Sequence, residues 1–414
     1  MSTLPVGSNT SMQARNIYFG RDSNRRLPKV VLKLLELDLI LLMATILMAI
    51  LGVVMDFSAT RNGLRLAGIS QYYWTKRDME FLAVGFLIMM ILAFSDYHRL
   101  ERIWRLIVGG LLFSLLIVMI PHVGQQKLGS QRWLQLGPLQ FQPSAFAGIC
   151  IAIAGAAMLA NKDKGLSWID IAKVLALTAL VMVIVAKQPD LGSAIVVGVL
   201  MAIMIVVAGA RVRQLIILAV LSTACVVLII KLGLLHGYQM QRLTSFLHPH
   251  KGTNSVNYNL TQSKIDIGSG GLFGKGLFKD QQTNLQYVPE QQTDFIFTAI
   301  GGQLGFVGGA SVIALYWVIA LRLLAAARRS IDRFGMLIAT AAFALFTFSA
   351  FENAGMTIGI MPITGIPLPL ISYGGSADFA FLIAIGLSLS VSRISRVQGQ
   401  TSSSANLISG VRIG

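Results

Sequence analysis

Long apolar runs, separated by polar stretches, recur along most of this chain and constrain its fold more than any other feature. A run of about 20 apolar residues is long enough to cross a bilayer as a helix. The chain is only 13% charged, whereas soluble domains average about 25%. The sequence therefore predicts an all-α, polytopic membrane protein with about ten transmembrane helices. We place the ten apolar segments at 37–57, 79–95, 103–120, 144–159, 168–186, 191–210, 214–233, 294–321, 336–359 and 374–391.

The charged residues favour a membrane-bound chain over one that binds nucleic acid. The net charge is +16, from 34 Lys and Arg against 18 Asp and Glu. The basic residues are scattered between the apolar runs, a distribution typical of loops that face anionic lipid and set the orientation of the chain. We therefore expect membrane lipids, and no nucleic acid, as partners.

Short basic loops alternate with loops that follow no such bias, and this alternation predicts the topology. By the positive-inside rule, the basic loops and both termini face the cytoplasm. The expected organisation is a basic cytoplasmic tail at 1–34, a ten-helix membrane domain at 35–392 and a disordered cytoplasmic tail at 393–414. The outward-facing loops are then 58–78, 121–143, 187–190, 234–293 and 360–373.

Cysteine and histidine offer little chemistry in this sequence. Cys150 and Cys225 lie inside apolar runs, so neither a disulfide framework nor a cysteine metal cluster is expected. His248 and His250 are too few for a metal site without further ligands, and a solvated loop is the favoured interpretation. No secretory signal pattern opens the chain, because 1–33 is polar and basic.

The most polar stretch, 258–297, combines glycines, amides and charged residues and runs directly into an apolar segment. Thr293 fits the N-cap of the coming helix, and Asp294 fits its first turn, where an acid complements the helix dipole. The same position is expected to lower the pKa of Asp294 and keep it ionised as a general base or cation ligand. Spacing alone favours the capping role and leaves the catalytic one open.

The glycine-rich run 268–276 does not match a nucleotide-binding loop. Ser269 replaces the first glycine of that pattern, and Gly276 replaces the Ser or Thr that would hold magnesium. Two interpretations remain open. The run is either a flexible surface turn or a set of backbone amides that, with Lys264 and Lys275, holds a diphosphate head group.

Two shorter motifs lie in other outward loops. Arg132 beside Trp133 suits either an interfacial aromatic anchor with a snorkelling cation or a fork-shaped donor for a phosphate or sugar acid. Asp190, in the tight turn 187–190, is favoured as a helix cap.

The segment 362–376 contains three prolines and three glycines, which interrupt helical hydrogen bonding at membrane depth. Irregular backbone in a membrane must be buried in protein or line a polar cavity. Glu352, in the apolar segment just before, is an intramembrane acid and therefore a functional candidate. A buried acid that is neutral or paired is the alternative interpretation.

Four motifs carry a resemblance to a known family, and they occur in the order GSQRWLQLGPLQFQPS, QPDLGSAIV, QSKIDIGSGGLFGKG followed by LQYVPEQQTDFIF, and NAGMTIGIMPITGIPLPLISYGGS. Together they resemble the SEDS family, the RodA/FtsW/SpoVE group of shape, elongation, division and sporulation proteins, over about 37–392. The short motifs QSKI, GKG and GIPLP look more like the elongation branch, RodA, than the division branch, FtsW.

The resemblance implies a ten-span helical fold in the bacterial cytoplasmic membrane and peptidoglycan glycosyltransferase activity, which polymerises lipid II into β-1,4-linked glycan strands. It also implies a class B penicillin-binding protein as the crosslinking partner. The essential acid of the family falls on Asp294, as general base of an inverting transfer or as cation ligand. No covalent cofactor is implied, and a role for Mg²⁺ or Mn²⁺ is left open. The expected substrate-binding residues are Arg132, Trp133, Arg242, Gln262, Lys264, Lys275 and Glu290.

The chain also departs from the family pattern. Gln292 stands where the family has His, and Ala145 and Gly148 replace a Glu and a Lys. Two acids are further replaced by Gly302 and Gln303. Losing an acid and a base three residues apart is consistent with an ion pair that was removed together.

Two other functions compete with glycosyl transfer. The first is a flippase or transporter for lipid-linked sugars, which the scarcity of charged groups inside the apolar segments argues against. The second is a non-catalytic scaffold for wall-synthesis partners, which the departures from the family pattern favour.

Overall fold

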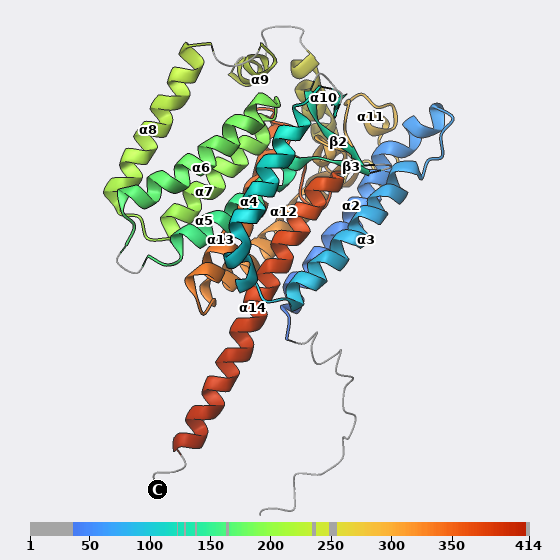
Figure 1. Ribbon diagram of the computed structural model, residues 1–414. Coiled ribbons are helices and arrows are strands. Elements are labelled where there is room, and N and C mark those ends of the chain that lie inside the picture. The colour runs from blue at the N-terminus through green and yellow to red at the C-terminus, as the bar shows by residue number, and fades with distance from the viewer. Residues whose placement is uncertain are drawn as a thin grey trace, which may run out of the picture. The chain divides into compact units, whose positions relative to one another are not determined.

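The computed structural model describes residues 36–121, 123–127, 130–136, 139–162, 165–233, 237–247 and 255–410. The expected basic tail at 1–34 and the two histidines at 248 and 250 lie outside this part of the chain. Residues 37–414 form one compact unit, which consists mainly of helices (Figure 1).

Each of the ten predicted apolar segments contains a helix. Within the described residues, α2, α6, α8, α12, α13 and the first part of α14 are long and apolar enough to cross a membrane, and α5 and α7 are shorter apolar helices. That all ten cross the membrane stays a prediction. The helices are α2 (Leu39–Leu66), α3 (Tyr73–Phe94), α4 (His98–Val118), α5 (Ala147–Leu159), α6 (Trp168–Lys187), α7 (Leu191–Val207), α8 (Val212–Lys231), α12 (Ile296–Arg328), α13 (Arg333–Ile358) and α14 (Gly375–Gly410).

Helix α2 is longer than the sequence predicts and occupies much of the expected loop 58–78. The extension is held by contacts with a loop far along the chain. Arg61 Nη2 donates to Phe278 O at 2.6 Å, and the rings of Phe57 and Phe278 meet edge to face at 5.8 Å.

Helix α14 also runs further than expected, to Gly410, whereas composition predicts a disordered tail from 393. Basic side chains tie its continuation to neighbouring carbonyl groups at helix ends. Arg393 Nε donates to Ala93 O at 3.0 Å, and Arg396 Nη1 donates to Leu37 O at 2.8 Å. The first of these bonds satisfies a carbonyl that the C-terminal end of α3 leaves unpaired, and the second ties α14 to the residue before the N-cap of α2.

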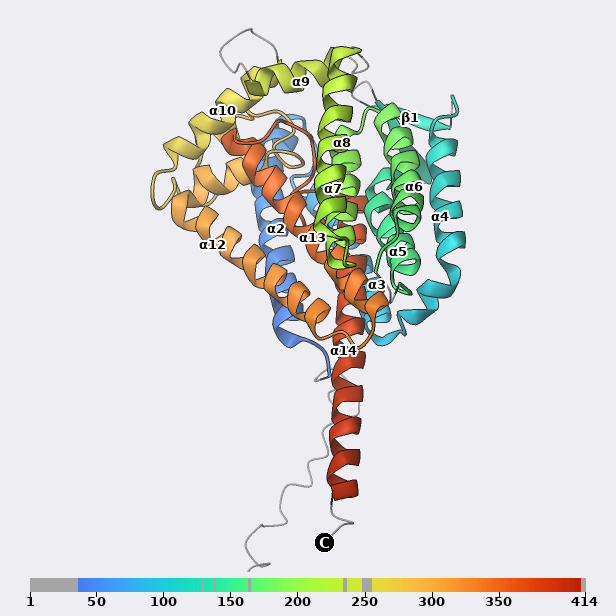
Figure 2. The same cartoon turned by 90° about the vertical axis from the view of Figure 1, so that its left-hand side faces the viewer.

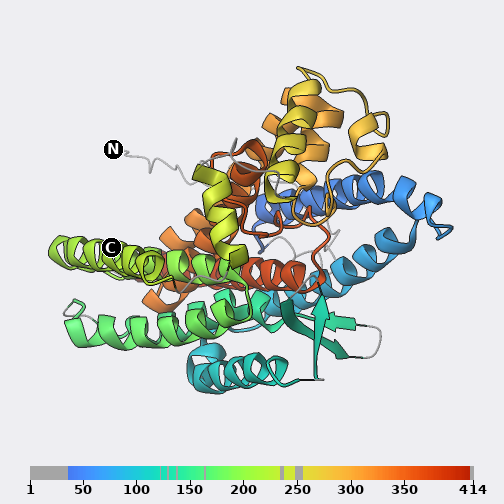
Figure 3. The same cartoon turned by 90° about the horizontal axis from the view of Figure 1, so that it is seen from above.

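The shorter elements gather at the end of the bundle opposite the C-terminus of α14 (Figures 1 and 2). The sequence analysis predicts only loops there. The elements are an antiparallel sheet of β1 (Gly124–Lys127), β2 (Ser130–Leu136) and β3 (Leu139–Phe141), the 3-10 helix η1 (Pro143–Phe146), and the helices α9 (Gly237–Leu247), α10 (Ser255–Ser269) and α11 (Gln281–Asn284). From above, α10 and α11 lie on one side and the strands on another (Figure 3).

The connection between α13 and α14 is irregular, as its prolines and glycines predict. Gly359 ends α13 in the left-handed conformation, with φ 82°, and α14 begins only at Gly375. Leu368 and Leu370 within it are 1% and 2% exposed. The prediction that this backbone is buried in protein is confirmed.

Candidate functional site

A pocket of about 390 Å³ opens where the strands, the irregular connection and the start of α12 meet. Both polar and apolar residues line it. The polar residues include three acids, Asp190, Glu290 and Asp294, and three arginines. The lining residues include Arg132, Trp133, Gln142, Ser144, Ala145, Gly148, Asp190, Arg242, Glu290, Gln292, Asp294, Leu345, Gly365, Tyr373 and Ser376.

Asp294 lies just outside α12 rather than in its first turn. The helix begins at Ile296, its N-cap is Phe295, and no side chain caps it. Thr293 Oγ1 instead donates to Glu290 O at 3.1 Å. The predicted cap at Thr293 is therefore wrong, because the chain makes a turn from Glu290 to Asp294 before the helix starts, with Asp294 N donating to Glu290 O at 3.1 Å.

The surroundings of Asp294 raise its pKa above the ordinary value, and the main cause is burial, which disfavours the charged carboxylate. Arg242 and Arg132 act in the opposite direction, and Asp190 adds to the rise. The expectation of a lowered pKa is wrong, because desolvation outweighs the helix terminus. A carboxylate with a raised pKa is a stronger base and is better matched to proton transfer near neutral pH.

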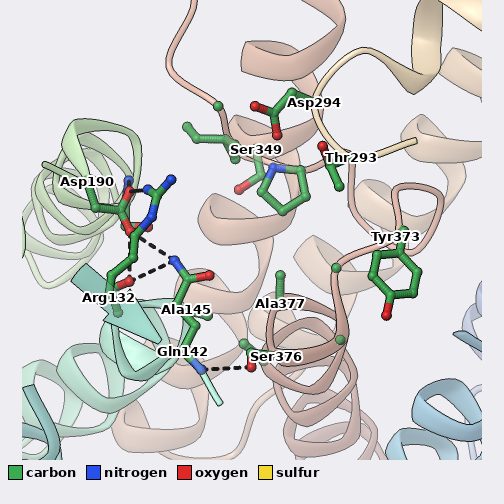
Figure 4. A pocket seen from close by; sticks show the side chains of 18 of the residues that line it. Arg132, Gln142, Ala145, Asp190, Thr293, Asp294, Ser349, Tyr373, Ser376 and Ala377 are labelled. Atoms are coloured by element: carbon green, nitrogen blue, oxygen red, sulfur yellow. Dashed lines mark hydrogen bonds and ion pairs between the residues drawn. The ribbon is translucent and has the colours of Figure 1, made fainter. Parts of the chain in front are cut away.

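Across the pocket, Asp190 caps α7 and also faces Arg132 (Figure 4). Its Oδ1 accepts from Ser193 N at 3.2 Å, which confirms the predicted cap. The Nη1 of Arg132, on β2, lies 3.7 Å from Asp190 Oδ1. Asp190 Oδ2 accepts from Ser144 Oγ at 2.7 Å and from Gln142 Nε2 at 3.1 Å. The arginine is thus held at the pocket wall by a buried, hydrogen-bonded acid.

Arg242, from α9, reaches the pocket beside the irregular connection. Its Nη1 donates to Thr364 O at 2.7 Å. A Cβ placed on Gly365 would lie 3.1 Å from Asp294 Oδ2 and 3.5 Å from Arg242 Nη1. Gly365 has φ 75° and no side chain, so the acid and the guanidinium both pack against its bare backbone.

Five of the predicted site residues meet at this pocket: Asp294, Arg132, Trp133, Arg242 and Glu290. The other three, Gln262, Lys264 and Lys275, do not line it. Gln262 and Lys264 are on α10, and Lys264 packs over Gly359 at the end of α13.

Lys275 belongs to the glycine-rich run, which packs against α12 instead of the pocket. Its Nζ lies 2.8 Å from Asp280 Oδ1. The amides of Lys275 and Gly276 donate to the carbonyls of Gly302 and Gln303, each at 3.0 Å. These amides are already bonded, so they are unavailable to a diphosphate.

Sequence reasoning missed the pocket role of three polar residues. The sequence predicts Asp190 only as a helix cap and predicts no pocket role for Gln142 or Ser144. Gln142 lies at the centre of this group, because its side chain donates to Ser144 and Asp190 and its backbone N–H donates to Ser376 Oγ at 3.0 Å, at the start of α14. The QPS and QPD motifs that hold these residues were the available signal.

Comparison with known families shows to which family the chain belongs. Residues 38–397 match the sequence model of the FtsW/RodA/SpoVE family, described as cell cycle proteins. The chain belongs to this family. It is the SEDS family that the motifs predict, and the predicted class of polytopic helical membrane protein is confirmed.

Two curated relatives of this SEDS protein illustrate the similarity. Stage V sporulation protein E of Bacillus subtilis (strain 168) is 32% identical over 361 residues, which cover 87% of this chain and 98% of that protein. The peptidoglycan glycosyltransferase MrdB of Escherichia coli (strain K12) is 35% identical over 316 residues, covering 76% of this chain and 85% of that protein.

Solved structures share the fold. A chain of a peptidoglycan synthase complex, studied for the structural coordination of polymerization and crosslinking, has a TM-score of 0.72 and 28% identity, covering 87% of this chain and 98% of that one. The Rod shape determining protein RodA of Thermus thermophilus has a TM-score of 0.63 and 28% identity, covering 86% and 97%.

Three departures from the SEDS pattern fall on the pocket wall. Ala145 and Gly148 line it where the family has a Glu and a Lys. A Cβ on Gly148 would lie 3.1 Å from Leu345 Cδ1, so this side of the pocket is apolar. Gln292 lines the pocket as well, and its backbone oxygen accepts from Tyr373 N at 2.9 Å.

The family pattern has acids at the positions of Gly302 and Gln303, and in this chain another acid lies beside Gly302. The carboxylate of Asp266, on α10, occupies the space beside Gly302. Gln303 Oε1 accepts from Ser58 Oγ at 2.7 Å and from Phe278 N at 3.0 Å. These residues join α10, α12 and α2 outside the pocket.

The pocket residues do not fit a metal ion held by the protein alone. Within the described parts of the chain, no group of three or more His, Cys, Asp or Glu is arranged to hold one. Asp190 is also engaged with other groups, because it forms an ion pair with Arg132 and caps the start of α7.

Proposed function

We propose that this protein is a peptidoglycan glycosyltransferase that polymerises lipid II into β-1,4-linked glycan strands. The observation that carries the proposal is one half-buried acid, Asp294, with a raised pKa, in a pocket that it shares with Arg132, Arg242 and apolar side chains. Relatives named as peptidoglycan glycosyltransferases support it. Such a pocket suits a substrate that has a sugar, a diphosphate and a lipid chain.

Asp294 acts as the general base in the proposed reaction. Its carboxylate takes the proton of a sugar hydroxyl on the incoming lipid II as that oxygen attacks the anomeric carbon of the donor. The new carbon–oxygen bond forms while the bond from the anomeric carbon to the diphosphate oxygen breaks, with inversion. The raised pKa of Asp294 makes it a competent proton acceptor.

The departing diphosphate gains negative charge and needs cationic partners. Arg132 and Arg242 supply them in this proposal, because a guanidinium presents paired donors to phosphate oxygens. Trp133 and Glu290 line the same pocket and contact the substrate. Lys264 and Lys275, which were expected to share this task, do not line the pocket, so the proposal assigns it to Arg132 and Arg242.

The biological setting extends the proposal. We propose that the protein lies in the bacterial cytoplasmic membrane, which its family membership supports. We also propose that both termini lie in the cytoplasm and that the pocket faces outward, which the charge of the short loops supports. A class B penicillin-binding protein is the proposed partner, and similarity to a chain of a peptidoglycan synthase complex supports it. Cell-wall elongation is the proposed process, from the RodA-like motifs.

The test is lipid II polymerisation by the purified protein, with and without a class B penicillin-binding protein. The proposal predicts glycan strands that a muramidase degrades. Absence of glycan in both conditions would reject the enzyme and favour a scaffold. A transporter would instead move lipid II across vesicles without polymerising it, so a fluorescent lipid II translocation assay on the same preparation separates that alternative.

A further inference from the structure

We propose that two adjacent residues of α13, Glu352 and Asn353, position the catalytic acid and its neighbouring arginine. The inference rests on the function proposed above. Neither residue lines the pocket. Both hold the irregular connection between α13 and α14, and Asn353 also holds the backbone of Asp294. They are positioning residues rather than catalytic ones.

Asn353 connects two backbone segments that meet at the pocket. It is fully buried, and its Nδ2 donates to Asp294 O and to Ile366 O, both at 2.8 Å. One amide group thus fixes the backbone of the catalytic acid to the irregular connection. Asn353 Oδ1 has no hydrogen-bond partner among the described residues, so the side chain acts there as a donor to these two carbonyls.

Glu352 fixes the same connection at Thr364, whereas Asn353 fixes it at Ile366. It is 1% exposed, and its Oε1 accepts from Thr364 Oγ1 at 2.9 Å. The carbonyl of Thr364 in turn accepts from Arg242 Nη1 at 2.7 Å. The carboxyl group of Glu352 therefore determines where the acceptor for Arg242 lies.

The two anchors bracket Gly365, against which the acid and the arginine pack. The connection has no regular secondary structure between 361 and 368 to hold its carbonyls in place. A displacement of about 1 Å at a catalytic group can cost on the order of 100-fold in rate. Anchoring by α13, a long and mostly buried helix, keeps Asp294 and Arg242 in a fixed position relative to each other.

The competing interpretation is that these bonds only satisfy buried carbonyls, as buried polar groups generally require. The two interpretations differ in what they predict for the titration of Asp294. If Glu352 and Thr364 position Arg242, losing their bond moves the guanidinium away and raises the pKa of Asp294 further. If they serve stability alone, the pKa of Asp294 in the folded protein does not change.

Thr364→Val removes the hydroxyl with almost no change in volume, and Thr364→Ser keeps the hydroxyl as the rescue variant. Asn353→Ala removes the other anchor. Thr340→Val is the matched control, because Thr340 is also buried on α13 and its hydroxyl bonds only to Met336 O in the same helix. Thermal unfolding of each purified variant establishes that it is folded.

Two readouts are combined. Carbodiimide labelling of Asp294 across pH, followed by peptide mass spectrometry, reports its titration without requiring activity. We expect Thr364→Val to shift the midpoint upward by on the order of 1 pH unit, and Thr364→Ser and Thr340→Val to match wild type. In lipid II polymerisation we expect kcat to fall about 10- to 100-fold in Thr364→Val and Asn353→Ala with little change in KM.

An unchanged labelling midpoint in folded Thr364→Val and Asn353→Ala would overturn the inference. So would activity losses that only follow the loss of folded protein. A wild type that makes no glycan would reject the proposed function, and the labelling midpoint would still decide whether the two residues position Asp294 and Arg242.

Discussion

Asp294 owes its chemistry to the groups packed around it. Burial raises its pKa, and Arg242 and Arg132 oppose that rise. The protonation state therefore depends on where two guanidinium groups lie, and these are fixed by Thr364 O and by Asp190. Gly365 packs against both the acid and Arg242.

Gly365→Ala is expected to disturb both groups. The added methyl group would lie 3.1 Å from Asp294 Oδ2, in a residue with φ 75°, a conformation that costs about 1–3 kcal/mol for a residue with a side chain. We expect polymerisation to fall at least about 10-fold beyond any loss of folded protein. Gly68→Ala is the control, because φ is 71° there and nothing lies within 4 Å of the added carbon. Equal activity of the two folded variants would contradict the described geometry.

At the residue scale, the family resemblance predicts Asp294, Arg132 and Arg242 as site residues but not their electrostatics. A helix start can be recognised in a sequence, whereas desolvation depends on packing that only the folded chain has. For the same reason Asp190 was identified as a cap, from its position before an apolar run, and not as the partner of Arg132, which lies far away in the sequence.

At the scale of elements, the polar stretch 258–297 separates into two parts with different tasks. Its end, with Asp294, faces the pocket. Its glycine-rich part packs on α12 near the non-helical Gly305, where Phe306 N donates to Gly271 O at 2.9 Å. A cluster of two buried acids, Asp266 and Asp280, and the half-buried Lys275 lies at this contact, with Lys275 Nζ 4.0 Å from Asp266 Oδ1.

This cluster predicts a specific pH dependence of stability. Burial and the nearby Asp280 raise the pKa of Asp266 to about 8, against the opposing effects of Lys275 and Gln291. Between about pH 4 and 8 the folded protein keeps the Asp266 proton and the unfolded chain has lost it, so stability falls as pH rises through this window. The pKa of Asp280 is lowered, so its contribution is lost only as pH falls below about 4.

The measurement is thermal unfolding in detergent at pH 5 and pH 8. Wild type is expected to lose stability between these values, and Asp266→Asn to lose less, because its amide does not titrate. Asp170→Asn is the control, because Asp170 is paired with Lys162 at 2.7 Å and is not part of this cluster. If wild type and Asp266→Asn change in parallel, Asp266 does not hold the proton.

The apolar helices were predictable because each contains a run of apolar residues, although α5 and α7 are short. The short elements were not, because β1, β2 and β3 have no clear alternation and depend on pairing with one another. The prolines and glycines of 362–376 predicted an irregular, buried segment correctly. They could not show that Glu352 and Asn353 anchor it, since those bonds reach across the fold.

At the scale of the whole molecule, the outward loops of the predicted topology meet at one end of the bundle, and the pocket lies among them. At the other end, Arg322 Nε donates to Asp38 Oδ2 at 2.9 Å, which joins α12 to the start of α2. This arrangement matches an enzyme whose substrate approaches from one face of the membrane. The family and its motifs predict that activity, and the pocket brings together five of the residues proposed to carry it.

The most direct test of the central claim is the polymerisation rate of purified Asp294→Asn on lipid II, with the partner transpeptidase present. The account predicts a loss of about 100- to 10,000-fold, the usual contribution of a general base, in a protein that unfolds at the wild-type temperature or above. Asp266→Asn, which changes a buried acid outside the pocket, should retain activity. Polymerisation by folded Asp294→Asn within a few-fold of wild type would contradict the account.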